Sequence, residues 1–421
     1  MWEIIRLNRR RSALLIGILG SVLVLLGGAI GYYLFPAEPA SGIFYGCIIA
    51  LGVWIFLLLT SMTSGEQILL ATAGARQISK QDAPQLYNVV EEMKIASGLP
   101  VVPKVYIINS HVPNAFAVGL KPERAAVAVT SGLLSKLNRD ELQGVIAHEI
   151  GHIANRDTLF MTMAGVTMGA VVILADLFLR GLWFSGGGNR RRSSKGGGQI
   201  EMIIFVLTIL LAILAPLLSQ LLYLATSRKR EYLADASAAQ FTRYPEGLAS
   251  ALEKISDNQE KNFSKSRTLA PMFIVNPMAS WEGTSGLFST HPPTAERVRI
   301  LRGMTQGSSL QKYEQAYRSI VKEGLMAPAT LKMAKEQGVR KADEKSKESH
   351  DPQKNLRQVK DLLHKVDGYG LITCGCGVKL KIPPKFKYSN VRCPKCNRMH
   401  DVSVALLAAT MAAELAQNKN T

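Results

Sequence analysis

The sequence predicts an α+β, multi-pass α-helical membrane protein with a mainly helical water-exposed part, a small β-sheet and a β-rich module near the C-terminal end. Three observations support this fold class. Four apolar runs, at about 13–35, 42–62, 158–184 and 202–226, each hold roughly 18 or more residues nearly free of charge, the length that crosses a ~30 Å hydrocarbon core as a helix. Amphipathic helical patterns and short strand-like segments lie between these runs. Two close pairs of cysteines follow them.

The N-terminal segment, residues 1–62, is expected to form a transmembrane hairpin. Its basic start, MWEIIRLNRRR, looks like the first part of a signal peptide. The apolar run that follows is too long for a cleaved signal, and a second run begins after the short FPAEPAS. We therefore interpret both runs as retained helices.

Residues 63–157 carry patterns of a water-exposed α+β unit. Residues 83–97 place apolar side chains at helical spacing, at Leu86, Val89, Val90 and Met93. The segments VVPKVYII (101–108), NAFAVGL (114–120) and AAVAVTSG (125–132) are typical of short strands. A further helix is predicted to begin at Asn138, because Glu141 occupies the capping-box position.

The helix after Asn138 contains the pattern His148-Glu-Ile-Gly-His152. Positions i and i+4 lie on one helix face, so two imidazoles can point at one metal ion. Glu149 is close enough to act on a water at that ion without serving as a ligand. The alternative is a surface helix whose histidines have ordinary partners. The pattern is followed at once by the third apolar run, which would hold the metal site just outside the bilayer.

A second helix offers a third ligand. Catalytic zinc takes three protein groups and leaves one position for water. In SRKREYLADASAAQF, Glu231 and Asp235 are four residues apart and share a helix face. Glu231 can complete a His, His, Glu set, and Asp235 can accept the second ring N–H of a ligand histidine. The alternative is a solvated, charged helix face.

These motifs together resemble a known family. HEIGH, REYLADASAA, PNAFAVG and FSTHPPTAER occur in this order beside the apolar runs. Over roughly residues 1–303 the chain resembles the HtpX-type membrane zinc metalloproteases, relatives of the CAAX prenyl endoprotease. The resemblance implies a gluzincin-like catalytic fold, one catalytic zinc ion, endoproteolysis of membrane or misfolded proteins, and a site that faces the cytoplasm.

The resemblance also implies roles for single residues. It makes His148, His152 and Glu231 the zinc ligands and Glu149 the general base. His291 and Arg297 match the family's His-Pro…Arg segment and would stabilise the oxyanion. The alternative for His291 is a loop residue before two prolines. The strand that contains Asn114, Ala115, Phe116 and Ala117 matches the family's edge strand, which would line the cleft and pair with an extended substrate.

The C-terminal part departs from that family pattern. Residues 307–366 are predicted to be a charged, weakly helical linker, and 403–421 a short C-terminal helix. Between them, 367–402 resembles a zinc ribbon. Cys-x-Cys and Cys-x-x-Cys pairs are spaced like metal ligands, so a closed structural zinc is expected, with disulfides as the alternative. The ligands would be Cys374, Cys376, Cys393 and Cys396.

Charge bears on partners and topology. About half of the 421 residues are hydrophobic, yet the formal net charge is +18, a combination that argues against a single water-soluble core. Residues 307–421 hold 21 Lys/Arg and 11 Asp/Glu, an excess of +10 that suits an anionic membrane face or nucleic acid. The ribbon contributes Lys379, Lys381, Lys385 and Lys387, which form either a binding face or a solvated one.

The third and fourth runs make up a segment, 158–226, that divides the catalytic part into 63–157 and 227–306. The basic, glycine-rich loop 185–199 joins the two runs. Four crossings would export this loop against the positive-inside rule. The alternatives are a hairpin that does not cross fully, or a pair of buried core helices. In the membrane models, the catalytic site and the C-terminal module face the cytoplasm from the cell inner membrane.

Two classes of function compete. The first is a membrane-anchored zinc endopeptidase for protein quality control, acting on polypeptides, especially membrane proteins; within this class, a narrow peptide-processing enzyme is an alternative. The second is a regulator or scaffold that acts through the basic ribbon on a protein or nucleic-acid partner. Glu149 favours the first class, because a scaffold needs no general base. Nucleic acid is accordingly the less favoured partner.

Overall fold

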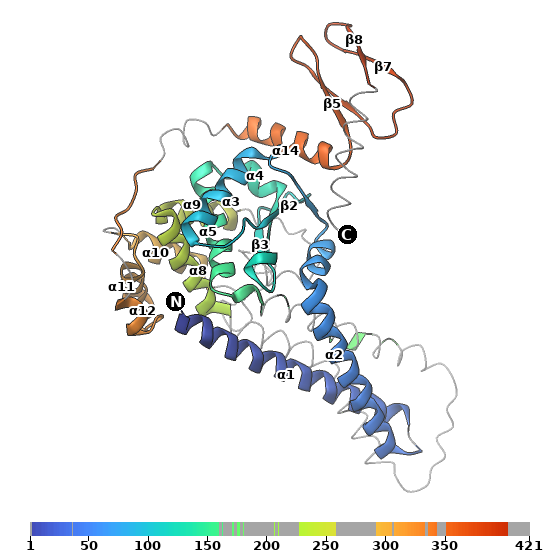
Figure 1. Cartoon of the computed structure of the whole chain (residues 1–421), viewed down its shortest axis with the longest axis vertical. Coiled ribbons are helices and arrows are strands. Elements are labelled where there is room, and N and C mark those ends of the chain that lie inside the picture. Colours follow the sequence, from blue (N-terminus) through green and yellow to red (C-terminus); the bar gives the residue numbers. More distant parts are fainter. Residues whose placement is uncertain are drawn as a thin grey trace.

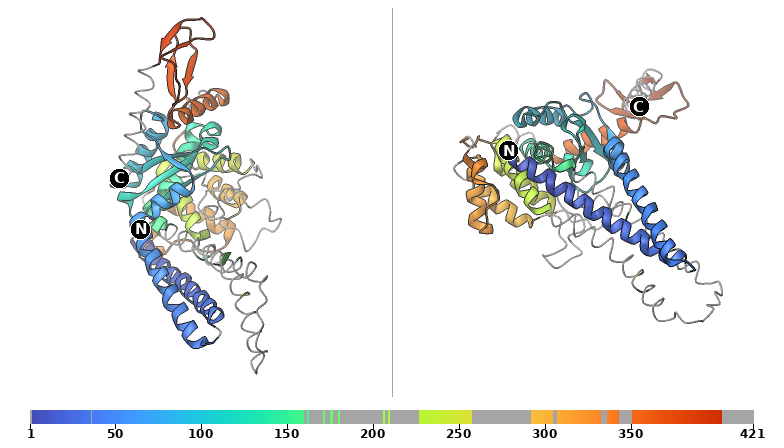
Figure 2. Two further views of the ribbon diagram at one scale, coloured as in Figure 1. Left: turned by 90° about the vertical axis from the view of Figure 1, so that its right-hand side faces the viewer. Right: turned by 60° about the horizontal axis from the view of Figure 1, so that its bottom comes forward.

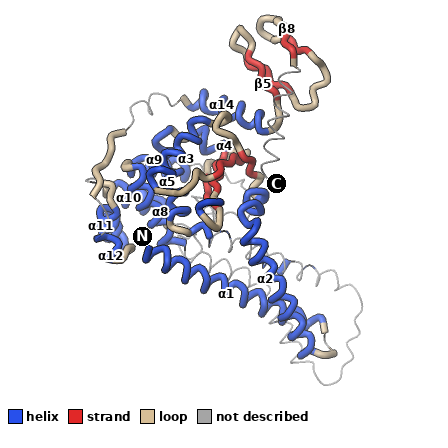
Figure 3. The backbone as a smooth tube through the Cα atoms, in the orientation of Figure 1, coloured by secondary structure: helices blue, strands red, loops and turns tan. Residues whose placement is uncertain are grey.

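The computed structural model describes residues 2–35, 37–159, 227–257, 292–304, 307–332, 336–342 and 351–402, together with the isolated positions 162, 171, 175, 176, 180, 206 and 209. Almost all of the third and fourth apolar runs, the loop 185–199, His291 and the predicted helix 403–421 therefore lie outside the described residues. Helices predominate, and the strands form three small sheets (Figures 1 and 3).

The N-terminal hairpin consists of α1 (Trp2–Leu34) and α2 (Pro39–Thr72), which lie side by side and project away from the rest of the molecule (Figures 1 and 2). Their backbones approach so closely that a Cβ on Gly31 would lie 2.1 Å from the Gly42 carbonyl oxygen. Glycine is therefore required at this contact.

Within the described residues, α2 is the one helix that is long and apolar enough to cross a membrane. Only 11% of its apolar window is buried, so most of these side chains are not covered by the part of the chain that the structure describes. The apolar part of α1, Ile16–Tyr32, is shorter. The helical hairpin predicted for residues 1–62 is present, whereas the number of crossings beyond it is set by runs outside the described residues.

The largest sheet contains four strands in the order β1-β2-β4-β3. β2 and β4 are parallel, and the other two pairs are antiparallel. The three predicted strands are confirmed. The sequence did not predict β1, because this strand has only three residues, Ala-Arg-Gln, and shows no alternation of apolar and polar side chains. The strands are β1 (Ala75–Gln77), β2 (Lys104–Ile108), β3 (Ala115–Val118) and β4 (Ala126–Thr130).

Alternate residues of the edge strand β3 pack against different layers. Ala115 and Ala117 belong to the main core with helices α3 (Pro84–Ser97) and α5 (Arg139–Ala154). Phe116 and Val118 belong to a second core that includes Leu69 of α2. The sheet thus lies between helices α3 and α5 and the base of the α1–α2 hairpin, which explains why its strands are apolar on both faces.

The remaining helices of the main body surround one face of the sheet. The helix predicted from apolar spacing in 83–97 is confirmed, and its four apolar side chains are buried. The start of α5 is also as predicted: the Asn138 side chain accepts from the Glu141 N–H, and the Glu141 carboxylate accepts from the Asn138 N–H. The elements are α3 (Pro84–Ser97), the 3-10 helix η1 (Pro122–Arg124), α4 (Ser131–Lys136), α5 (Arg139–Ala154), α8 (Ser227–Thr242), α9 (Pro245–Ser256) and α10 (Thr294–Arg302).

The charged linker predicted over 307–366 differs from what the structure shows. Its described part forms α11 (Leu310–Val321), α12 (Pro328–Lys332) and α14 (Pro352–Val366). Tyr313 and Tyr317 of α11 are buried in the main core, as is Leu362 of α14. Much of this segment is therefore an integral part of the main body rather than a spacer.

The C-terminal module consists of two antiparallel hairpins, and each cysteine pair lies at the turn between its strands. The module extends from the main body at the end opposite the α1–α2 hairpin (Figure 1). The strands are β5 (Gly370–Thr373), β6 (Lys379–Ile382), β7 (Asn390–Arg392) and β8 (Met399–Asp401).

Candidate metal centre

The two histidines of α5 face each other in the protein interior. His148 is 0% and His152 is 4% exposed. Their rings lie one helical turn apart, and the two Nε2 atoms are 3.2 Å from each other. Two basic nitrogens at this distance, away from water, are suited to share a cation.

Glu231 of α8 completes the set. Its Oε2 lies 3.5 Å from His148 Nε2, and its Oε1 lies 3.4 Å from His152 Nε2. Tetrahedral zinc with bonds of ~2.0–2.1 Å requires ligand atoms ~3.3–3.4 Å apart. The 3.2 Å between the two nitrogens is close to this spacing, and the Glu231 carboxylate faces each nitrogen with one oxygen at a similar distance. The donors, two imidazoles and a carboxylate, suit zinc.

Glycine brings the two helices close enough for this geometry. A Cβ on Gly151 would lie 3.1 Å from the Ser237 Cβ and 3.2 Å from the Ala234 carbonyl oxygen. A larger side chain would push α8 outward and move Glu231 away from the histidines. The fourth residue of HEIGH thus has a packing role that the motif alone does not reveal.

Each ligand histidine has a carboxylate at its other ring nitrogen. Asp235 Oδ1 lies 2.9 Å from His148 Nδ1, and Asp157 Oδ2 lies 3.2 Å from His152 Nδ1. Burial would lower the pKa of His148, but hydrogen bonds with Asp235 and Glu231 outweigh it and raise the pKa. Each carboxylate favours a proton on Nδ1, which leaves Nε2 as the donor for a metal.

Arg297 of α10 lies behind Asp235. Its Nε and Nη2 donate to the two carboxylate oxygens of Asp235 at 2.8 and 2.7 Å, and its side chain is 1% exposed. Burial acts to lower the pKa of Arg297, but Asp235 raises it further than burial lowers it, so the guanidinium is charged. On the other histidine, Arg230 Nε lies 3.8 Å from Asp157 Oδ1. The centre thus has an arginine and an aspartate behind each imidazole.

Glu149 is the next residue after His148 and is 2% exposed. Burial raises the pKa of its carboxyl, and the nearby His148 and His152 act to lower it. A bound divalent cation would lower it further through its charge. These opposing effects are typical of a carboxylate that exchanges a proton during a reaction.

The structure brings together His148, Glu149, His152, Glu231, Asp235 and Arg297, while His291 lies outside the described residues. The oxyanion role that the resemblance implied for Arg297 stays a prediction. Its guanidinium is bound to Asp235 on the Nδ1 side of His148, and its Nη1 lies 3.6 Å from Glu231 Oε2. This arrangement fits a residue that positions the ligands.

The predicted substrate strand is placed beside the centre. Ala115, Phe116 and Ala117 belong to β3, Asn114 directly precedes it, and all four are buried. β3 is the last strand of the sheet, pairs with β4 along one edge and contacts α5.

Sequence reasoning missed Asp157 and Arg230. Asp157 follows the turn that ends α5, where Arg156 adopts a left-handed conformation with φ 62°. That turn, which no helical period describes, brings Asp157 back to His152, five residues earlier. The carboxylate in HIANRD just beyond the second histidine was the available signal.

A second cluster is formed by the four ribbon cysteines, whose sulfur atoms lie within 4.8 Å of one another. Cys374 and Cys396 are 3.4 Å apart, and Cys376 and Cys393 are 3.5 Å apart. These distances far exceed the ~2.05 Å of a disulfide and approach the ~3.8 Å expected for thiolates on tetrahedral zinc. Backbone N–H groups of Cys396 and Lys395 lower the pKa of Cys393 to about 6, which favours a thiolate at that position. For Cys374, a backbone hydrogen bond from Cys376 acts to lower the pKa, but burial and the neighbouring sulfurs outweigh it and raise the pKa.

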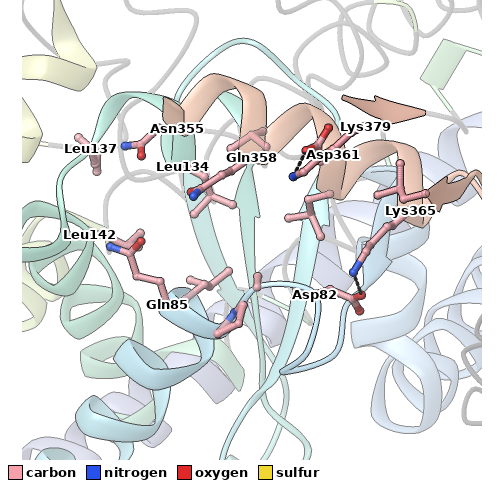
Figure 4. Close-up of a pocket in the computed structure, with 16 residues that line it drawn as sticks. Asp82, Gln85, Leu134, Leu137, Leu142, Asn355, Gln358, Asp361, Lys365 and Lys379 are labelled. Carbon is pink, nitrogen blue, oxygen red and sulfur yellow. Dashed lines mark hydrogen bonds and ion pairs between the residues drawn. The ribbon is translucent and has the colours of Figure 1, made fainter. Parts of the chain in front are cut away.

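The basic face predicted on the ribbon is partly neutralised by α14. Lys379 and Lys381 pair with Asp361 at 2.7 and 3.3 Å. This contact borders a pocket of about 440 Å³ between α14 and the segment around Asp82, where Lys365 reaches Asp82 at 3.8 Å (Figure 4). The pocket belongs to this junction and not to the metal centre.

Comparison with known proteins places this geometry in context. The model of peptidase family M48 matches residues 80–305. A "Protease HtpX homolog" from Dictyoglomus thermophilum is 43% identical over 303 residues, which cover 72% of this chain and 94% of that protein. One from Lactobacillus helveticus is 39% identical over 305 residues, 72% of this chain and 100% of that protein. The crystal structure of S. mikatae Ste24p is 22% identical with a TM-score of 0.38, over 72% of this chain and 67% of that one.

Proposed function

The chain belongs to peptidase family M48 and is a membrane-associated metalloprotease, and from that premise we propose that it is a zinc endopeptidase that cleaves membrane or misfolded proteins at the cytoplasmic face. Its substrates are polypeptides, as for any protease. The proposal goes further by assigning the residues, the number of metal ions, the side of the membrane and the class of substrate.

The observation that carries the proposal is the triangle of ligand atoms. His148 Nε2 and His152 Nε2 are 3.2 Å apart, and the Glu231 carboxylate faces both, with Oε2 at 3.5 Å from the first and Oε1 at 3.4 Å from the second. One ligand atom from each residue lies within 4.8 Å of the other two, close enough to share one zinc ion. We assign these three residues to one catalytic zinc and the four ribbon cysteines to one structural zinc. Three protein ligands leave a position open for chemistry, whereas four thiolates close the second site.

The chain's own residues then have distinct roles. Zinc held there would supply Lewis-acid polarisation of the scissile carbonyl and a more acidic water. Glu149 accepts the proton of the attacking water and delivers it to the leaving amine. Asp235 and Asp157 fix the imidazole orientations, and Arg297 holds Asp235 in place. The centre is thereby organised before a substrate arrives.

The edge strand β3 is the proposed binding element for substrate. An extended peptide can add to the edge of a sheet through main-chain hydrogen bonds, which recognise backbone rather than sequence. β3 contacts α5, the helix that carries both histidines. A peptide on this edge would lie near the metal ligands, and weak dependence on sequence suits a quality-control protease.

The membrane connection supports the proposed class of substrate. Leu69 and Leu70 of α2 pack with Phe116 of β3 in one core, so the hairpin continues directly into the catalytic sheet. In the sequence, the helix that carries His148 and His152 also leads into the third apolar run. A polypeptide that emerges from the bilayer would therefore lie close to the metal centre.

The proposal is tested with Glu149→Gln in the full-length enzyme. Membrane proteomes of cells that express wild-type or variant protein are compared, together with the zinc content of each purified protein. We expect the wild-type fragments to vanish while zinc remains at the catalytic site, because Glu149 is not a ligand. Glu123→Gln, an exposed change on η1, is the control and should preserve every fragment. Full cleavage by the Glu149 variant would remove it as the base.

The scaffold alternative rests on the basic ribbon. Two of its lysines already pair with Asp361 within the chain, which reduces the charge open to an anionic partner. Lys385 and Lys387 are exposed and remain the candidates for such a partner. Nucleic acid is therefore the less favoured ligand of this module.

A further inference from the structure

The segment beyond the family match contacts both helices that carry metal ligands. The match ends at residue 305, and the chain then forms α11, α12 and a strap of residues 336–342. We refer to these three parts as the extension. The Lactobacillus helveticus protein is matched over its whole length by 305 residues, which leaves 421 − 305 = 116 residues of this chain without a counterpart in it.

Arg340 of the strap bridges the ends of α5 and α8. Its Nη2 donates to Asp140 Oδ1 at 2.6 Å and to Gln143 Oε1 at 2.7 Å, both in the first turns of α5. Its Nε donates to the carbonyl oxygen of Thr242, the last residue of α8, at 3.1 Å. One guanidinium thus joins the two helices.

Further contacts hold the strap at this junction. The Arg340 backbone N–H donates to the Arg243 carbonyl oxygen at 2.8 Å, and the Arg243 side chain returns a bond to Gly338 O at 3.1 Å. The Arg340 guanidinium also lies 4.9 Å from the centre of the Tyr244 ring. The dipole of α8 favours the Arg340 guanidinium at the C-terminus of that helix, and the dipole of α5 stabilises the Asp140 carboxylate to which the guanidinium binds.

The metal centre and Arg340 lie at opposite ends of the same helix pair. His148 is eight residues beyond Asp140, about 12 Å along α5, and Glu231 is eleven residues before Thr242, about 16 Å along α8. Because α-helices are stiff over these lengths, a change in their relative tilt at one end displaces side chains at the other. Metal ligands tolerate displacements of only about 0.5 Å.

The extension also supports α8 near its ligand end. Tyr317 of α11 packs edge-on against Tyr232, the neighbour of Glu231, with ring centroids 4.9 Å apart. Tyr313 is fully buried in the same core. The extension therefore contacts α8 at two separated points, beside Glu231 and at the end of the helix.

Internal hydrogen bonds make the extension a defined unit. The buried carboxylate of Glu314 accepts from the N–H groups of Leu325 and Met326, each at 3.1 Å. Ser308 N–H donates to Gln337 O at 2.9 Å and ties the strap to the start of α11. The strap that carries Arg340 is thus connected to α11, which is itself packed in the main core.

We propose that the extension is a built-in clamp that fixes α5 against α8, and that Arg340 is a positioning residue for the catalytic metal centre. The inference rests on the proposed function, since it assumes that His148, His152 and Glu231 hold the catalytic zinc. It adds a device in which a segment outside the family match stabilises the ligand geometry from the far end of the helices.

The test compares full-length Arg340→Ala and Arg340→Lys with wild type. The matched control is Arg302→Ala, because Arg302 also pairs with two carboxylates, Glu246 and Glu253, but joins α10 to α9 instead of the ligand helices. Three quantities are measured: the rate at which a chelator removes the catalytic zinc, kcat and KM for a peptide, and amide hydrogen exchange across 148–152 and 231–235.

Arg340→Ala should lose catalytic zinc faster by on the order of tenfold. It should lower kcat with KM nearly unchanged, and speed amide exchange at both ligand segments. Arg340→Lys should show each effect more weakly than Arg340→Ala. Its ammonium can pair with Asp140 but cannot bond to Asp140, Gln143 and Thr242 together as the planar guanidinium does. Arg302→Ala should resemble wild type. If Arg340→Ala does not fold, the comparison of Arg340→Lys with wild type and Arg302→Ala tests the proposal instead.

The clamp is wrong if the Arg340 variants match Arg302→Ala in zinc loss, kcat and exchange at the ligand segments. Faster exchange confined to residues 139–143 and 240–244 would likewise reduce Arg340 to a local structural residue. If wild-type protein holds no zinc at the three ligands, the proposed function fails instead. The clamp would then be judged by amide exchange alone, which needs no metal.

Discussion

Arg297 binds both oxygens of Asp235, from Nε at 2.8 Å and from Nη2 at 2.7 Å, although both side chains are almost completely buried. Asp235 in turn lies 2.9 Å from Nδ1 of His148. A charge on α10 is thereby connected, through a residue of α8, to a metal ligand on α5. Such a pair is costly to break, because either partner alone would be a buried, uncompensated charge.

Arg297→Ala should destabilise the protein strongly. Burial raises the pKa of Asp235, and Arg297 offsets this and keeps the pKa below its ordinary value. The ionised Asp235 therefore contributes stability above its unfolded-state pKa, which is lost as pH falls through the folded-state value. Removal of Arg297 should cost about 3–5 kcal/mol at neutral pH, measured by denaturant unfolding of the detergent-solubilised protein.

Arg302→Ala serves as the control for this loss, since it removes an arginine from the same helix with two exposed ion pairs and should cost about 1 kcal/mol or less. Arg297→Lys should lie between the two, because lysine keeps the charge without the two-pronged geometry. Equal unfolding free energies for Arg297→Ala and Arg302→Ala would contradict the assigned role of the Arg297–Asp235 pair.

Asp235→Asn and Asp157→Asn should each weaken binding of the catalytic zinc by roughly 10–100-fold. Both aspartates accept from a ligand imidazole, so an amide would orient its histidine less well. Competition with a chromophoric chelator measures the affinity. Ser250→Ala, which removes a hydroxyl bonded to Glu141 at the start of α5, is a control that leaves the ligands untouched. Unchanged affinity in the Asp157 variant would show that its contact with His152 is incidental.

Glu231→Ala should abolish both proteolysis and the catalytic zinc, because two histidines alone hold zinc poorly. The ribbon zinc should remain, so the total zinc content should fall by one ion per chain. Elemental analysis of the purified variant measures this loss. Two ions retained in the variant would place the third ligand elsewhere, and none retained would mean that the two sites are coupled.

The two metal sites should also differ toward chelators. The three proposed catalytic ligands would leave a coordination position open to an attacking chelator, whereas the four ribbon cysteines would surround their ion and fold the module around it. Activity should therefore disappear with the first zinc released, before the circular dichroism of the module changes. Release of the cysteine-bound ion first would reverse the proposed roles of the sites.

The local features of the centre could be predicted from sequence. The i, i+4 spacing of His148 and His152 and the capping box of Asn138 and Glu141 depend only on helix geometry, so each follows from a few neighbouring residues. The strands were recognisable because apolar residues dominate them on both faces. Asp157, by contrast, reaches His152 through a left-handed turn, which no periodicity encodes.

The extension was misjudged because its charge obscured a helical pattern. Leu310, Tyr313, Tyr317 and Ile320 recur at helical spacing, yet lysine, arginine and glutamate separate them and suggest a solvated chain. The bridge from Arg340 to Asp140 joins residues 200 positions apart. Contacts of that separation depend on how the helices pack, which a single sequence does not reveal.

The last prediction concerns topology, where sequence signals conflict. Arg6, Arg9, Arg10 and Arg11 favour a cytoplasmic N-terminus, and two crossings would return the chain to the cytoplasm before the catalytic segment. The base of α2 packs on the catalytic sheet, which fits a site next to the membrane. Thiolates of the ribbon also require a reducing compartment.

The basic loop 185–199 decides between the two arrangements. Four crossings would place it outside, whereas a hairpin that does not cross fully would keep it in the cytoplasm. We favour four crossings, because both later runs are long enough to span the bilayer and glycines flank the basic residues. A cysteine introduced at Ser193 should then react with a membrane-impermeant thiol reagent in intact cells, and one at Ser346 should not. Wild-type protein gives the background of its native cysteines. Labelling at neither position would support the hairpin, and labelling at Ser346 would overturn the cytoplasmic assignment of the whole C-terminal part.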